Sequence, residues 1–126
     1  MSLAHALLNE GRSAAALRQA AIAVQEDAGR DGLLVQQHAL ILERLGRFDE
    51  ALDGYRRALG LLRRAGDEHA QAKLLGNRGV LHAYRGALRA AEADLLEAER
   101  LAERLGLRLM AATMRQNLAW LAGRRG

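Results

Sequence analysis

The sequence repeats itself with a period of 40 residues, and this repeat constrains the possible folds more than any other feature. When the chain is shifted by one period, identical residues coincide. The coinciding sets are Gly46, Gly86 and Gly126; Gly66 and Gly106; Asn77 and Asn117; Ala51 and Ala91; Ala58 and Ala98; Leu61 and Leu101; and Arg64 and Arg104. The apolar residues Ile41, Leu81 and Leu121 fall in the same register. So many coincidences in one register indicate repeated structural units.

Each period reads as two helices separated by glycine breaks. Apolar residues recur with helical spacing over residues 33–45, 49–64, about 68–85 and 88–104. The breaks are Gly46, Gly66, Gly86 and Gly106. Glycine suits the end of a helix because the residue there often needs a positive φ. The chain has no proline and few β-branched residues, so the pattern predicts an all-α fold.

Composition limits the class of protein. The 126 residues are long enough for a single domain, 1–126, with its own core. No cysteine is present, which excludes a disulfide framework and fits a cytoplasmic protein. No apolar run approaches the length of a membrane span, and the first residues lack the layout of a signal peptide. We therefore expect no membrane association.

The net charge of +4 comes from an excess of arginine. Lys73 is the only lysine, a bias typical of a GC-rich bacterial genome such as an actinobacterial one. The arginines are scattered and interleaved with acidic residues, as in Glu97, Arg100 and Glu103. Nucleic-acid-binding proteins more often gather them in a stripe with stacking aromatics. Solvated helix faces are therefore favoured, and no nucleic-acid partner is expected.

The stretch from Leu34 to Leu59 resembles the tetratricopeptide repeat, in which small residues let two helices approach closely and large ones fill the remaining space. In one copy these positions hold Val35, Ala39, Leu42, Gly46, Phe48, Ala51, Tyr55 and Ala58. In the next they hold Leu75, Gly79, His82, Gly86, Leu88, Ala91, Leu95 and Ala98. The resemblance implies a right-handed superhelical solenoid of antiparallel helix pairs, with about seven helices. HEAT and armadillo repeats have similar periods but fit the Gly46 turn poorly.

The repeats are predicted at residues 32–71 and 72–111, with a partial repeat at 1–31 and a half repeat at 112–126. In the partial repeat, Gly11 takes the place of the turn glycine. We expect an excerpt from a longer array, or a chain that finishes in a capping helix. The spacing between turn glycines is 35 residues from Gly11 to Gly46 and 40 from Gly46 to Gly86, so about one helical turn is added. Such long repeats resemble those of kinesin light chains and bacterial multi-repeat regulators.

The resemblance also implies a concave groove, lined by the first helix of each pair. The residues expected in it are Gln36, Gln37, Leu40, Arg44, Lys73, Asn77, Val80, Tyr84, Thr113, Asn117, Trp120 and Arg124. A row of carboxamides, Gln37, Asn77 and Asn117, could pair with the backbone of an extended peptide. The alternative is that they only solvate the groove or bond to a neighbouring helix.

Leu40, Val80 and Trp120 would form an apolar strip beside that row, with Trp120 as an anchor for the ligand. The alternative is that Trp120 packs against a second helix of its own repeat.

Enzymatic chemistry finds no support in the residue patterns. None of the four histidines lies in a metal-binding pattern, and neither serine lies in a nucleophile elbow. His82 occupies a packing position and is expected to be buried or half-buried. The sequence therefore predicts no enzyme, no cofactor and no metal.

Two functions remain. The first is a protein- or peptide-binding scaffold or adaptor, as part of a larger multidomain regulatory protein. The alternative is structural self-association as a homodimer through the open C-terminal end, where the apolar residues Met114, Leu118 and Leu121 of the last helix are expected to be exposed.

Overall fold

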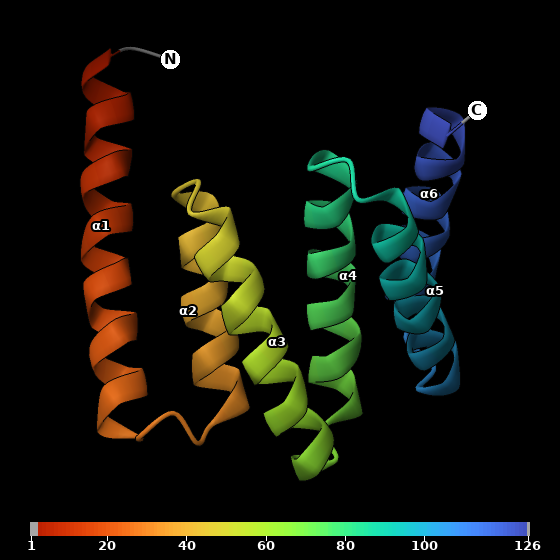
Figure 1. Cartoon of the computed structure of the whole chain (residues 1–126), viewed down its shortest axis with the longest axis horizontal. Coiled ribbons are helices and arrows are strands. Elements are labelled where there is room, and N and C mark those ends of the chain that lie inside the picture. Colours follow the sequence, from red (N-terminus) through yellow and green to blue (C-terminus); the bar gives the residue numbers. More distant parts are fainter. Residues whose placement is uncertain (1–2, 126) are drawn as a thin grey trace. The chain divides into compact units, whose positions relative to one another are not determined.

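The computed structural model describes the backbone of residues 3–125 and the side chains of residues 11–124. This part of the chain forms six α-helices and no strand, which confirms the all-α prediction (Figure 1). The helices are α1 (Leu3–Glu26), α2 (Gly32–Arg44), α3 (Phe48–Ala65), α4 (Glu68–Tyr84), α5 (Leu88–Arg104) and α6 (Arg108–Arg125). They fall into two compact units, Met1–Arg64 and Ala65–Gly126.

The glycine breaks are confirmed as helix ends. Gly46, Gly86 and Gly106 have φ values of +79°, +83° and +73°. At each, the following N–H donates to the carbonyl oxygen five residues earlier, as in Arg47 to Leu42 at 2.9 Å. This bonding satisfies carbonyl groups that the helix end leaves open, and it needs a residue that tolerates positive φ.

The expected turn at Gly11 is wrong. Helix α1 runs through it without interruption, and the described residues form six helices, near the expected number of about seven. A single glycine inside a helix costs only about 1 kcal/mol relative to alanine. The flanking alanine- and leucine-rich segments compensate for that cost, and Gly11 is not among the glycines at positive φ.

Helix α4 is about one helical turn longer than α2. Helix α2 has 13 residues and α4 has 17, and α4 begins before the position that corresponds to the start of α2. The Asp31 side chain caps α2 by accepting from the Leu33 N–H at 2.9 Å. Asp67 caps α4 in the same way through the Ala70 N–H at 3.1 Å. The two aspartates therefore fix where these helices begin.

In the first unit, α2 and α3 meet through small residues. A Cβ added to Gly54 would lie 2.9 Å from the Cβ of Ala39, so only glycine allows this approach. Tyr55 is fully buried beside it, and its hydroxyl donates to Glu43 Oε1 at 2.7 Å. Burial, together with this bond, raises the pKa of Tyr55 well above its usual value.

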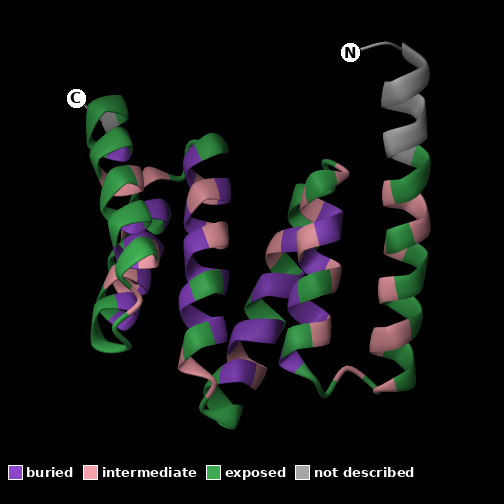
Figure 2. Ribbon diagram, turned by 180° about the vertical axis from the view of Figure 1, so that it is seen from behind, coloured by how far each residue is buried: buried purple, intermediate pink, exposed green. Residues whose placement is uncertain are grey.

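In the second unit, α4 is the central helix. Its Gly79 faces Leu95 of α5, and its Gly76 faces Met114 of α6. Figure 2 shows the resulting line of buried residues along α4. Met114 and Leu121 are 8% and 1% exposed, so the expectation that they lie open on α6 is wrong. They are buried because α6 turns this side toward the helices before it.

Asp94 of α5 is buried and paired with α4. The Arg78 guanidinium donates to both of its carboxylate oxygens, at 2.6 and 2.9 Å. His82 Nε2 lies 3.9 Å from Asp94 Oδ2 and is half-buried, as its packing position predicts. Burial lowers the pKa of His82, with Arg78 and Arg85 acting in the same direction and Asp94 opposing them.

Ala28, after α1, has a φ of +57° and is the only residue other than glycine at positive φ in the described chain. We expect Ala28→Gly to stabilise the protein by about 0.5–1 kcal/mol, because the left-handed region strains a residue that has a Cβ. Ala21→Gly, at an exposed position inside α1, is the matched control and should destabilise by about 1 kcal/mol. Thermal unfolding followed by circular dichroism measures both. A destabilised Ala28→Gly variant would contradict the strain at this turn.

Candidate functional site

In the second unit, eight of the predicted groove residues lie on two neighbouring helices. Lys73, Asn77, Val80 and Tyr84 follow one another on α4, and Thr113, Asn117, Trp120 and Arg124 have the same spacing on α6. Steps of three and four residues place side chains on one helix face. All eight are exposed or partly exposed. We call this set the α4–α6 face.

An aromatic pair joins the C-terminal ends of α4 and α6. The ring centroids of Tyr84 and Trp120 are 5.6 Å apart, with the planes tilted by 52°. The Arg124 guanidinium carbon lies 4.9 Å from the Trp120 centroid, within reach of a cation–π interaction. Tyr84 remains 72% exposed and Trp120 41%. The pair thus presents partly open ring surface to solvent instead of closing into a core.

Asn77 and Asn117 lie between the aromatic pair and the N-terminal part of the face. Both are partly exposed, and neither carboxamide has a hydrogen-bond partner among the described residues. Thr113 differs, because its hydroxyl donates to the Leu109 carbonyl within α6. The two asparagines therefore keep donors and acceptors available to a ligand.

The charges on this face have one sign. Helix α6 contains no acidic residue, and α4 has only Glu68, which forms an ion pair with Arg104 of α5. Lys73 and Arg124 are both exposed. A ligand on the α4–α6 face would meet Lys73 and Arg124, and Glu68, the only acid of the two helices, is paired with Arg104.

The other four predicted groove residues lie on α2, in the first unit. Gln37 and Arg44 are exposed, and Leu40 is partly exposed. Gln36 is only 6% exposed, so little of its side chain is available to a ligand.

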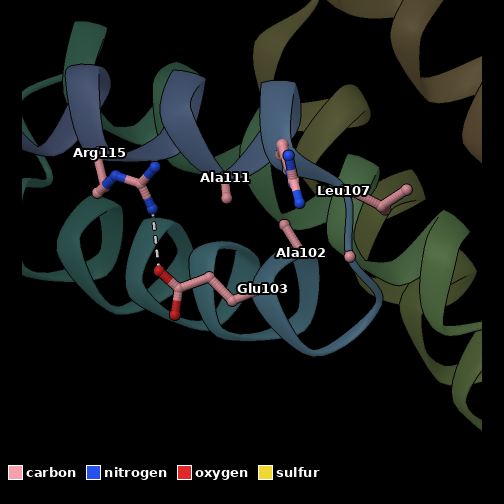
Figure 3. Close-up of a pocket in the computed structure, with 7 residues that line it drawn as sticks. Ala102, Glu103, Leu107, Ala111 and Arg115 are labelled. Atoms are coloured by element: carbon pink, nitrogen blue, oxygen red, sulfur yellow. Dashed lines mark hydrogen bonds and ion pairs between the residues drawn. The ribbon is translucent and has the colours of Figure 1, made fainter.

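The hollows on the helix surfaces escaped prediction from the sequence, and two of them contain more than one arginine. One, of about 350 Å³, lies between α5 and α6, where Ala102 and Ala111 face each other and Arg115 donates to Glu103 at 2.9 Å (Figure 3). The other, of about 340 Å³, combines residues of α3 with Gly29. Each brings together residues distant in sequence. Their only local signal is a group of arginines at helical spacing, which also describes a solvated surface.

The described residues contain no cluster of histidine, aspartate and glutamate that could hold a metal ion. None of their helices is both long and apolar enough to cross a membrane. A family model described as tetratricopeptide repeat matches residues 32–104, which covers α2 to α5.

Proposed function

We propose that this chain, which belongs to the tetratricopeptide repeat family, binds an extended segment of a partner protein on its α4–α6 face. Repeats of this family generally mediate protein–protein interactions and scaffolding, and they are typically not enzymes. The family suggests a protein partner, and we propose the α4–α6 face as its binding surface. The α2 residues Gln37, Leu40 and Arg44 remain predicted groove residues of the first unit.

The observation that carries this proposal is a pair of asparagines without hydrogen-bond partners among the described residues, beside a partly exposed aromatic pair. A carboxamide offers one acceptor and two donors, so it can bond the backbone of an extended peptide whatever its side chains are. Tyr84 and Trp120 can take up an apolar side chain of the same peptide, since aromatic rings bury much area at low entropic cost. The asparagines would bind the peptide backbone by hydrogen bonds, and the aromatic pair would bind an apolar side chain of the same peptide.

The wider setting is part of the same proposal. We infer a scaffold or adaptor segment of a larger multidomain regulatory protein, of the long-repeat type similar to kinesin light chains. The 17-residue length of α4 supports the long-repeat assignment. The sequence of the full-length gene would test whether the chain is a segment of a multidomain protein. A gene that encodes a repeat array and no other domain would contradict this proposal.

Binding should depend on both asparagines. We expect Asn77→Ala/Asn117→Ala to weaken the binding of peptides selected against the wild-type chain by about tenfold to a hundredfold, since each lost hydrogen bond contributes roughly 1 kcal/mol. Fluorescence of Trp120, the only tryptophan, measures the dissociation constant. Gln19→Ala/Gln25→Ala removes two exposed carboxamides from α1 and is the matched control. Equal affinity in all three proteins would exclude the asparagines from the binding surface.

Self-association is the second candidate, and Leu109 is the observation that favours it. Leu109 is 86% exposed at the start of α6, and Leu105 is 39% exposed nearby. Such an apolar patch suits a homodimer contact better than the buried Met114 and Leu121 do. Light scattering after size exclusion tests this, with Leu109→Glu as the variant. A wild-type protein that stays monomeric at high concentration would contradict self-association.

A further inference from the structure

We propose that α3 carries a binding site for a phosphate monoester dianion, in the hollow lined by Gly29, Arg56, Arg57, Gly60, Leu61 and Arg64. This site lies within the first unit, and nothing in the peptide-binding proposal uses it. Its volume of about 340 Å³ accommodates a phosphate group and part of the molecule that carries it.

The helical spacing of α3 brings the arginines together. Arg57, Gly60 and Arg64 are separated by three and four residues, so they lie along one stripe of the helix, with Arg56 beside it. Gly29 reaches the same hollow from the loop between α1 and α2. Three arginines thus line one concave surface.

The described residues that line the hollow include three arginines and no acid. Asp53, which is not part of this lining, accepts from Arg56 at 2.8 Å and from Arg57 at 3.2 Å. Arg64 instead donates its Nε to the Gly60 carbonyl at 3.3 Å. Arg56 holds the pKa of Asp53 below its usual value, with Arg57 adding to the effect, so the carboxylate stays charged. Exposed ion pairs of this kind contribute little, and an incoming dianion can replace Asp53 at small cost.

The two glycines leave room for an anion. A Cβ added to Gly29 would meet no atom within 4 Å, and one added to Gly60 would meet only the Arg64 terminal nitrogen, at 3.7 Å. A phosphate monoester has three terminal oxygens and two charges, so it can accept from two guanidinium forks at once. A carboxylate can satisfy only one fork in this way. The geometry therefore favours phosphate over a carboxylate ligand.

Titration of the whole chain with inorganic phosphate, followed by amide resonances in NMR at constant ionic strength, tests the site. We expect saturable shifts at Gly29, Gly60 and Leu61. Arg57→Gln and Arg64→Gln should each weaken binding about tenfold, because each removes a charge-assisted hydrogen bond. Asp53→Asn should strengthen binding, since the competing carboxylate is gone. Arg63→Gln, which removes the same charge from an exposed neighbour outside the hollow, is the control.

Equal weakening by Arg63→Gln and Arg57→Gln would overturn the site and leave only a general charge effect. Shifts that do not saturate, or an Asp53→Asn variant that binds no better, would also overturn it. A phosphoserine peptide and its serine counterpart distinguish the sources of the group. Tighter binding of the phosphopeptide than of inorganic phosphate would identify a phosphorylated side chain, and equal binding would identify the free anion.

Discussion

Replacing Gly79 by alanine is expected to lower the free energy of unfolding by about 2 kcal/mol. The new Cβ would lie 2.8 Å from Leu95 Cγ and 3.3 Å from the Ala91 carbonyl oxygen. Leu95 is fully buried and the carbonyl belongs to the backbone of α5, so neither group can move aside freely. The gain of about 1 kcal/mol in helix propensity does not offset this overlap.

Gly60→Ala provides the matched control for that substitution. It lies inside α3, where an added Cβ meets only the end of the Arg64 side chain at 3.7 Å. Without a clash, alanine should stabilise by up to about 1 kcal/mol. The two variants should therefore differ by about 3 kcal/mol in urea unfolding. A Gly79→Ala protein as stable as wild type would show that α4 and α5 do not pack this closely.

Arg78→Ala is expected to destabilise the chain by about 3 kcal/mol at neutral pH, because it leaves the carboxylate of Asp94 buried without its bidentate partner. The value lies at the low end for buried pairs, since the Arg78 side chain is 20% exposed. Arg78→Met/Asp94→Leu, which removes both charges, should recover most of the loss. Arg100→Ala breaks an exposed pair with Glu97 and should change stability little.

The same variant should respond to pH in a characteristic way. In the wild type, the pKa of His82 is lowered from 6.5, so the folded state binds fewer protons than the unfolded state. Wild-type stability should therefore fall as the pH drops through 6.5 toward that lowered pKa. Without Arg78, one cause of the lowering is absent, and protonated His82 can pair with Asp94. The deficit of Arg78→Ala should thus shrink between neutral pH and pH about 5.5. A constant deficit, measured by urea unfolding at both pH values, would contradict this coupling.

Much of the fold could be predicted because its signals are local. Periodicity and helix-end residues predict the helices from α2 to α6 and the glycine breaks between them. The spacing of residues within one repeat predicts the family. Gly11 shows the limit of such signals. A glycine in a turn position and a glycine inside a helix look alike in sequence, and the difference arises from the segments that surround it.

The candidate site was predicted in part for the same reason. Residue spacing predicted that Asn77 and Tyr84 share one helix face, and that Asn117 and Trp120 share another. It could not show that Tyr84 and Trp120 contact each other, because that contact depends on the approach of α4 to α6 at Gly76 and Met114.

The sequence by itself determined the helices, their ends and their repeat, since these depend on backbone preferences and on residues within a few positions of each other. Only the tertiary structure decided which faces are covered. It buried Met114 and Leu121, paired Arg78 with Asp94, and brought Gly29 to the arginines of α3. These outcomes depend on distances between helices, which are set by packing of side chains far apart in the chain.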